Sequence, residues 1–268
     1  MALPSNERED LELVRGILYI ATGERCCSEA ILNAQRCRRS NPSLPITIKT
    51  DLSDRPDLVS IFDSVISIQF PSHSYRDKVT GFSELPYEQT LFLDSDACLI
   101  APIDDIFDLL KVSDLAAAHA PVRHPPGWSD DSVPRTFPEL NTGVMLMRRS
   151  RVIDDLMSAW IALYDDLLQA NSQFWDQASF RSVLWNSLRR GNLRFLHLPT
   201  EANLRTTKPW FAGRGLPVYV VHGRFNSCEF DSFVEFLNAD VDGFRTWDKW
   251  VCMHPETSIR PRFDRTFG

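Results

Sequence analysis

Short apolar segments alternate with helical segments along most of the chain, and this alternation constrains the fold more than any other feature. The segments with strand character are 16–23, 45–51, 65–70, 89–96, 114–121, 140–149, 193–198 and 217–223. The segments with helical character are 28–40, 104–110, 154–170 and 176–190, and we expect Ser28 to cap the first. Strands that alternate with helices predict an α/β fold whose mostly parallel central sheet is flanked by helices.

The composition is that of a globular protein without general affinity for nucleic acid. The 268 residues are 43 % hydrophobic, which suffices for a packed core. A formal net charge of −7 argues against nucleic acid as a partner, because phosphate binding depends on an excess of Lys and Arg. We find no transmembrane segment and no signal-peptide pattern at the start, so we expect a cytoplasmic protein. The six cysteines form no CxxC pair, which predicts free thiols.

The chain is expected to form one large domain over 16–225, after a lead-in at 1–15, because no Gly/Ser-rich linker divides it. Residues 226–268 would form a small C-terminal extension, with a helix at 231–239 and a tail packed on the domain. Residues 122–138 are rich in Pro, Asp and Ser and lack periodicity. They predict a long loop of the kind that often covers a binding site.

One apolar strand, Leu91-Phe92-Leu93, ends in two carboxylates, Asp94 and Asp96, with a single residue between them. Two ionised carboxylates this close repel each other unless water or a cation lies between them. The pair therefore points to a metal ion. An ordinary turn is the alternative, because Asp is common in turns for its hydrogen bonds to the backbone.

Polar residues also follow other predicted strands. They are Thr22 and Gly23, Thr50 and Asp51, and His222 and Gly223. Ligands of open α/β sheets bind beyond the carboxyl ends of the strands, so these groups would converge with the two aspartates if the strands are neighbours. Two carboxylates and an imidazole favour Mn²⁺, which accepts oxygen and nitrogen ligands, over Mg²⁺, which is the second choice. An open metal site suits a diphosphate, and Arg76 and Lys78 would add positive charge there.

The order of motifs resembles that of a known enzyme family. The segment 76–110, RDKVTGFSELPYEQTLFLDSDACLIAPIDDIFDLL, resembles the nucleotide-sugar-binding region of GT-A-fold glycosyltransferases. It is most similar to family 8, the type of glycogenin and of bacterial lipopolysaccharide galactosyl- and glucosyltransferases. The opening strand and helix at 16–42, LNTGVMLMRR, FWDQASF and VVHG resemble further motifs of this family in the same order.

The resemblance implies that 16–225 is a GT-A (Rossmann-like) catalytic domain, and it implies roles for the matched residues. Asp94, Asp96 and His222 would hold Mn²⁺. Those implied near the nucleotide and the diphosphate are Thr22, Gly23, Asp51, Arg76, Lys78, Ser95 and Arg224. Those implied near the sugar are Asn141, Thr142, Gly143, Asp176 and Gln177. Asp176 and Gln177 are the candidate catalytic residues, and Asp176 also fits a helix N-cap. The family's lysine after the histidine is missing, so Arg224 or Lys208 would replace it.

The residues and the resemblance together predict a hexosyltransferase that uses a nucleotide sugar, with UDP as the expected nucleotide, and a glycan, glycolipid or small molecule as acceptor. The resemblance implies retention of configuration, by double displacement or front-face substitution. One alternative is a haloacid-dehalogenase-like phosphohydrolase with Asp94 as nucleophile and Asp96 as acid and base. Cys98 speaks against it, because that family has Thr or Val there. Another alternative is a non-catalytic relative that binds a sugar nucleotide.

The tail mixes aromatic and basic side chains, which suggests either a membrane contact or a packed strap. The residues are Trp247, Trp250, Phe263, Phe267, Arg260, Arg262 and Arg265. Such a mixture could touch an anionic membrane at its inner face or a glycolipid acceptor. The absence of a long amphipathic helix favours packing on the domain. The oligomeric state is not predicted by any of these patterns.

Overall fold

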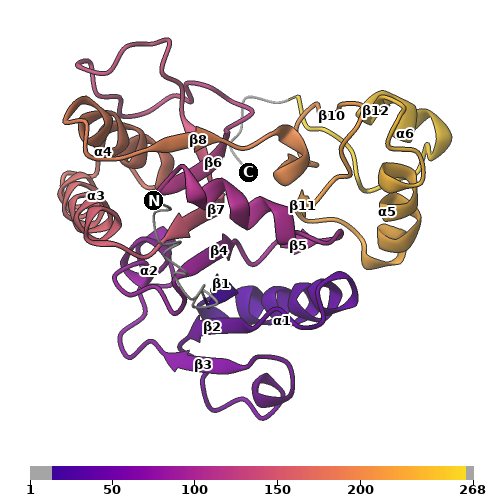
Figure 1. Cartoon of the computed structure of the whole chain (residues 1–268), viewed down its shortest axis with the longest axis horizontal. Coiled ribbons are helices and arrows are strands. Elements are labelled where there is room, and N and C mark those ends of the chain that lie inside the picture. The colour runs from indigo at the N-terminus through magenta and orange to yellow at the C-terminus, as the bar shows by residue number, and fades with distance from the viewer. Residues whose placement is uncertain (1–13, 264–268) are drawn as a thin grey trace, which may run out of the picture.

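The computed structural model describes residues 14–263, and its centre is a seven-stranded sheet (Figure 1). The strand order is β3-β2-β1-β4-β7-β6-β8. The strands are β1 (Arg15–Ile20), β2 (Ile46–Thr50), β3 (Ser64–Ser67), β4 (Gln89–Leu93), β6 (Leu115–His119), β7 (Leu140–Arg148) and β8 (Phe195–His197). Neighbouring strands are parallel, except that β7 is antiparallel to both β4 and β6. The predicted α/β fold with a mostly parallel sheet is confirmed.

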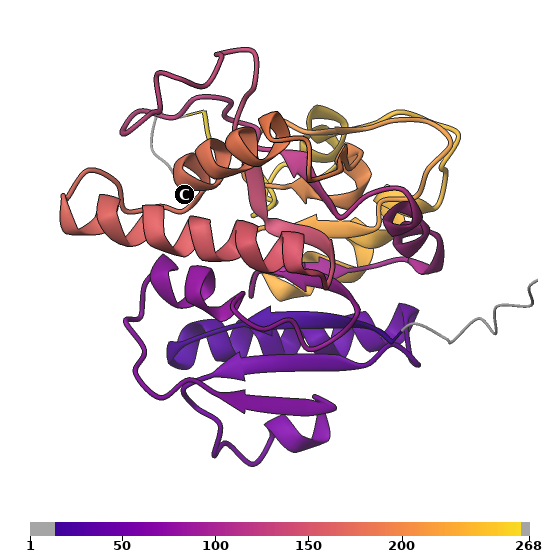
Figure 2. The same cartoon turned by 60° about the vertical axis from the view of Figure 1, so that its left-hand side comes forward.

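Helices cover both faces of this sheet. They are α1 (Gly23–Ser40), α2 (Tyr75–Gly81), α3 (Arg151–Gln169), α4 (Gln177–Arg189) and the 3-10 helix η2 (Asp104–Lys111). Alternate residues of β1 point to opposite faces, so Ile17 and Tyr19 pack with α1 and η2, whereas Leu18 and Ile20 pack with α2, α3 and α4. Figure 2 shows α3 and α4 side by side on the second face. The sheet is thus buried between two apolar layers.

The first helix begins earlier than its sequence pattern predicts. It begins at Gly23, directly after β1, and Ser28 lies inside it, so the predicted cap at Ser28 is wrong. Asp51, which follows β2, explains the difference, because its Oδ1 accepts a hydrogen bond of 2.9 Å from the Gly23 N–H. A carboxylate from the loop after the neighbouring strand therefore satisfies one backbone N–H at the helix N-terminus.

A second, three-stranded sheet lies beside the first and contains β5 (Ala97–Leu99), β11 (Val220–His222) and β9 (Leu204–Arg205). Strand β11 is antiparallel to β5 and parallel to β9. The sequence argument for convergence assumed that the strand ending in His222 is a neighbour of β1, β2 or β4 in the central sheet. That assumption is wrong, because this strand, β11, belongs to the second sheet. It reaches the aspartates by another route, because β5 follows them directly and pairs His222 with Ala97.

The C-terminal residues pack around a third apolar cluster (Figure 1). The elements around it are β10 (Phe211–Ala212), its partner strand β12 (Arg245–Thr246), α5 (Phe230–Asn238), with η4 (Ser227–Glu229) just before it, and α6 (Trp247–Met253). Two further 3-10 helices lie outside this cluster: η1 (Leu58–Ser60) between β2 and β3, and η3 (Thr200–Ala202) between β8 and β9. Trp250 is 1 % exposed and packs edge-on against Phe233, and Trp247 contacts Phe263. Phe267 and Arg265, two residues of the predicted tail, lie outside the described residues. The buried Trp250 supports packing on the domain.

The segment 122–138 is a long loop without helix or strand, as predicted. Arg181 of α4 holds it, because the guanidinium donates to the carbonyl oxygens of Val133, Pro134 and Phe137. Within residues 14–263, no helix has both the length and the apolar content needed to cross a bilayer.

Candidate active site

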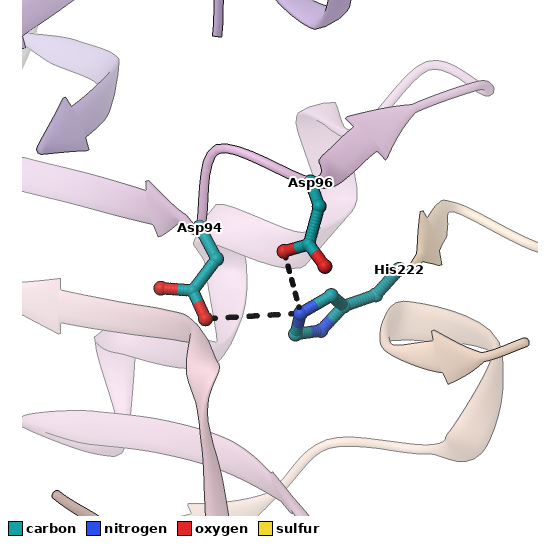
Figure 3. A group of neighbouring side chains, drawn as sticks. All are labelled: Asp94, Asp96 and His222. Carbon is teal, nitrogen blue, oxygen red and sulfur yellow. Dashed lines mark ion pairs between the residues drawn. The ribbon is translucent and has the colours of Figure 1, made fainter. Parts of the chain in front are cut away.

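Asp94, Asp96 and His222 meet where the two sheets join (Figure 3). The two aspartates flank the turn between β4 and β5, and His222 ends β11. His222 Nε2 lies 3.7 Å from Asp94 Oδ2 and 3.3 Å from Asp96 Oδ1. His222 is 1 % exposed, so the three groups form a cluster whose histidine is buried and whose carboxylates are partly open.

The backbone of β7 approaches this cluster at Gly143, which has no side chain. A Cβ at this position would lie 2.2 Å from His222 Cε1 and 2.5 Å from Asp94 Oδ2. The Gly143 carbonyl also accepts a 2.8 Å hydrogen bond from the Asp94 N–H. Only glycine leaves room for both side chains, so the strand positions the cluster and limits its volume.

The surroundings of the cluster lower the pKa of both Asp96 and His222. Burial would raise the pKa of Asp96, but His222 and the guanidinium groups of Arg205 and Arg224 outweigh it and hold this pKa well below its usual range. Burial and Arg205 lower the pKa of His222, despite the two aspartates that raise it. A guanidinium N–H of Arg205 donates to His222 Nε2. The ring nitrogen that faces the carboxylates thus acts as an acceptor.

The three residues fit a divalent cation. Ligands bound about 2.1 Å from one ion lie about 3 Å apart when adjacent and about 4 Å apart when opposite. The ligand atoms of Asp94, Asp96 and His222 all lie within 4.8 Å of one another, so small rotations would bring them to these spacings. Two carboxylate oxygens and a neutral imidazole nitrogen form a donor set that Mn²⁺ accepts and that leaves further coordination positions open.

A buried lysine links this cluster to the predicted catalytic carboxylate. Lys78 Nζ lies 3.0 Å from Asp94 Oδ1 and 2.9 Å from Asp176 Oδ2. Thr142 donates to Asp176 Oδ2 at 2.6 Å and accepts from Lys78 at 3.1 Å. Burial would lower the pKa of Lys78, but Asp176 and Asp94 outweigh it and raise this pKa, so the ammonium group remains charged. Asp176 is 2 % exposed and lies just before α4, at its N-cap, without a side-chain capping bond.

A cavity of about 840 Å³ opens over these residues. One wall carries charged groups from both sheets and the segments that follow them, including Lys78, Asp94, Asp96, Arg205, Lys208 and Arg224. Other lining residues are apolar or aromatic, and they include Pro121, Val122, Phe174 and Trp175, which we call the apolar wall. The cavity therefore offers a charged region and an apolar region to one ligand or to two adjacent ligands.

Most residues implied by the family resemblance lie at this cavity. Those that line it are Thr22, Lys78, Asp94, Ser95, Asp96, Asn141, Thr142, Gly143, Asp176, Gln177 and Arg224, and His222 lies just behind. Gly23 and Asp51 lie next to the lining residues Thr22 and His73 rather than in the wall. Ser95 donates to Glu29, and Arg224 forms a bidentate ion pair with the same carboxylate.

Arg76 does not lie in the wall of the cavity. It forms a bidentate ion pair with Asp165 of α3, with distances of 2.8 and 3.0 Å. Lys78, on the same helix, does line the cavity. The expected role of Arg76 beside the diphosphate or the sugar is therefore not supported by its position.

Several residues of the site were missed in the sequence. Arg205 ends β9 and contacts His222, and Asn203 accepts a hydrogen bond from the same histidine. Both belong to the segment LPTEANLRTTKPW, of which only the lysine had been considered. Tyr75, Phe174 and Trp175 line the cavity as well, and aromatic residues beside the predicted sites at 76–78 and 176–177 were the signal for them.

No family model and no curated protein matches the sequence, whereas many solved structures match the fold. An active-site mutant of LgtC aligns with a TM-score of 0.53 and 13 % identity, over 82 % of this chain and 94 % of that chain. The galactosyltransferase LgtC with donor and acceptor sugar analogues aligns with a TM-score of 0.47 and 13 % identity, over 77 % and 86 %.

The glycosyltransferase GlyE of Streptococcus pneumoniae aligns with a TM-score of 0.48 and 18 % identity, over 72 % of this chain. The chain spans about half the length of GlyE, at 48 %. The alignment with the LgtC mutant extends over 94 % of that chain. On this likeness, the chain has the GT-A fold of LgtC.

Proposed function

We propose that the chain is a metal-dependent glycosyltransferase that transfers a hexose or a related sugar from a nucleotide diphosphate sugar to an acceptor hydroxyl. One observation carries the proposal: Asp94, Asp96 and His222 form a cluster with the donor set for a divalent cation, beside a cavity of about 840 Å³, in a chain of GT-A fold. The alternative of a phosphohydrolase does not account for this fold. A non-catalytic relative would share it, so the two differ only in turnover.

The charged wall suits a diphosphate. A divalent cation, and Mn²⁺ above all, would supply positive charge that stabilises the departing diphosphate. Arg205, Lys208 and Arg224 line the same wall, so the chain itself brings cations beside the cluster despite its net charge of −7. Glu29 holds Arg224 by two hydrogen bonds of 2.7 and 2.9 Å, which orients the guanidinium toward Asp96 at 3.6 Å.

The nucleoside would lie against the ends of β1 and β4. Thr22 and Ser95 line this part of the cavity, and Gly23 and Asp51 stand directly beside it. We propose UDP as the nucleotide, in line with the family resemblance.

The sugar would lie toward Asp176, Gln177 and Asn141. Lys78 and Thr142 both hold Asp176 Oδ2, which fixes the carboxylate in the wall of the cavity. A carboxylate held in this way suits either a nucleophile in a double displacement or a group that stabilises positive charge during front-face substitution, and both routes retain configuration. Asp176 and Gln177 are the catalytic candidates for this reason.

The acceptor would enter along the apolar wall. Phe174 is 58 % exposed at this wall, and Trp175 lies beside it, directly before Asp176. Aromatic rings of this kind pack against the apolar face of a sugar or against the apolar part of a small aglycone. A glycan, a glycolipid or a small glycoside is therefore the class of acceptor that we propose.

Hydrolysis of a panel of nucleotide sugars tests the proposal, with Mn²⁺, with Mg²⁺ and with a chelator. We expect release of the nucleotide from one or a few UDP-sugars, stimulated by Mn²⁺ and abolished by the chelator. Asp96→Asn should abolish this release. Asp108→Asn serves as a matched control, because Asp108 lies on η2, where its side chain is half-exposed and pairs with Lys111.

The outcome distinguishes the candidate functions. Turnover of a phosphoester without any nucleotide sugar would contradict the proposal and support a phosphohydrolase. Binding of UDP by calorimetry, without hydrolysis or transfer for any donor, would support the non-catalytic relative.

A further inference from the structure

A chain of buried hydrogen bonds leads from β7 to the ring of His222. The Gly143 N–H donates to Asn141 Oδ1 at 3.1 Å. Asn203 Nδ2 donates to the same Oδ1 at 2.9 Å, and Asn203 Oδ1 lies 2.9 Å from His222 Nδ1. Asn141, Asn203 and His222 are 7 %, 4 % and 1 % exposed, so solvent has little access to these bonds.

The direction of every bond in this chain follows from its first donor. A backbone N–H can only donate, so the atom of Asn141 that faces Gly143 is the oxygen. That oxygen then requires a donor from Asn203, which places the amide nitrogen of Asn203 toward Asn141. The amide oxygen of Asn203 consequently faces His222, and Nδ1 of the ring must carry the proton.

The other ring nitrogen therefore presents a lone pair. His222 Nε2 faces Asp96 Oδ1 at 3.3 Å and Asp94 Oδ2 at 3.7 Å. Arg205 gives an independent reason for the same tautomer, because a guanidinium can only donate and its N–H contacts Nε2. Three acceptor atoms thus face one another, with Arg205 on Nε2, Lys78 on Asp94 and Arg224 near Asp96 as the positive groups around them, and this arrangement also suits a cation between the three atoms.

We propose that Asn203 is a positioning residue that keeps His222 in the Nδ1–H tautomer and aims Nε2 at the divalent cation. This inference rests on the proposed cation site and extends it to a residue that does not itself reach the cation. Without an acceptor at position 203, the Nδ1–H is left buried and unpaired, and this cost favours movement of the proton to Nε2 against the contact with Arg205; an N–H at Nε2 cannot bind a metal. Asn141 orients the amide of Asn203, and its own Nδ2 donates to Gln177 at 3.4 Å, so it also joins this chain to the sugar side of the cavity.

Two substitutions separate positioning from simple structural support. Asn203→Leu removes the acceptor for Nδ1–H and the donor to Asn141 at similar volume. Asn203→Asp keeps an acceptor for Nδ1–H but loses the amide donor. A purely structural role predicts that both variants lose Mn²⁺ affinity alike, whereas the positioning role predicts that only Asn203→Leu loses it.

The readouts are the ¹⁵N chemical shifts of the His222 ring in the metal-free protein and the affinity for Mn²⁺ measured by paramagnetic resonance. We expect the Nδ1–H tautomer in the natural protein and in Asn203→Asp, with Mn²⁺ affinities within a few-fold. In Asn203→Leu we expect population of the Nε2–H tautomer and an Mn²⁺ affinity lower by about 10- to 100-fold. Urea unfolding checks that each variant is folded.

The possible failures can be told apart. An Nε2–H tautomer in the metal-free natural protein overturns the inference, and this measurement needs no variant. An Nδ1–H tautomer and unchanged Mn²⁺ affinity in Asn203→Leu overturn it as well. A natural protein that has the Nδ1–H tautomer but binds no Mn²⁺ overturns the proposed cation site and, with it, the role of Asn203 toward a cation.

Discussion

Replacing Gly143 by alanine should destroy cation binding more than it destabilises the fold. The new Cβ would lie 2.2 Å from His222 Cε1 and 2.5 Å from Asp94 Oδ2, whereas contacts of real Cβ atoms are essentially never below 3.0 Å. Both side chains must therefore move by several tenths of an ångström or more. Metal–ligand distances tolerate changes of only about 0.2 Å, so the cluster would lose its geometry.

The expected magnitudes differ for the two properties. Inserting a methyl group into a packed region costs about 1–3 kcal/mol of the free energy of unfolding. Displacing two of three ligands should lower the Mn²⁺ affinity by about 100-fold or more, since even a change in the groups that support a ligand costs 10- to 100-fold. Calorimetric titration with Mn²⁺, with and without UDP, measures the second effect, and urea unfolding measures the first.

Gly213→Ala provides the matched control. A Cβ at Gly213 meets only Glu201 Oε1 at 3.4 Å, which is an ordinary contact. This variant should keep the Mn²⁺ affinity of the natural protein. If a folded Gly143→Ala protein also keeps that affinity, the cation does not bind at Asp94, Asp96 and His222, and the reasoning is refuted.

Three further predictions concern buried charges. Lys78→Met leaves Asp176 without its ammonium partner and should lower the free energy of unfolding in urea by about 3–5 kcal/mol. The double variant Lys78→Met with Asp176→Asn should recover part of this loss, and equal losses in the single and the double variant would contradict the pairing. Burial raises the pKa of Glu139 to about 8, above the ordinary value of 4.5. Its contribution to stability is therefore complete below pH 4.5 and lost as pH rises to 8, with a slope of up to about 1.4 kcal/mol per pH unit that Glu139→Gln should remove from urea-unfolding data. Arg205→Met removes the donor at His222 Nε2 and should tighten Mn²⁺ binding in the absence of nucleotide while weakening the binding of UDP; calorimetry showing weaker Mn²⁺ binding would contradict this.

The local pattern of the sequence predicted where helices and strands lie better than it predicted which strands pair with one another. Apolar periodicity located the strands of the central sheet, β11 and the long helices, because burial on one or two faces leaves that pattern in the sequence. It missed the short strands β5 and β9, which pair with β11. It did not reveal that β7 runs antiparallel or that β11 leaves the central sheet, because strand direction and pairing depend on contacts between distant segments. The start of α1 was misplaced for the same reason, since Asp51 of another loop satisfies it.

The site residues divide in the same way, into those that the local sequence reveals and those that only contacts between distant segments reveal. Asp94 and Asp96 stand out because adjacent carboxylates after an apolar strand are costly without a cation. Asn203 and Arg205 carry no such signal, because an amide or a guanidinium is common anywhere on a surface and only its contact with His222 gives it a role. Arg76 shows the opposite case, in which a suitable side chain close in sequence to the site is held elsewhere by Asp165.

The two aspartates of the cluster are not equivalent. Asp96 contacts His222 and the guanidinium of Arg224. Asp94 instead divides its carboxylate, because Oδ1 lies 3.0 Å from Lys78 while Oδ2 lies 3.3 Å from Lys78 and 3.7 Å from His222. Lys78 holds Asp176 with the same ammonium group. A cation bound by Asp94 would thus share this carboxylate with Lys78, which in turn holds the candidate catalytic residue Asp176. In the proposed enzyme, donor binding and the position of Asp176 therefore depend on one shared side chain.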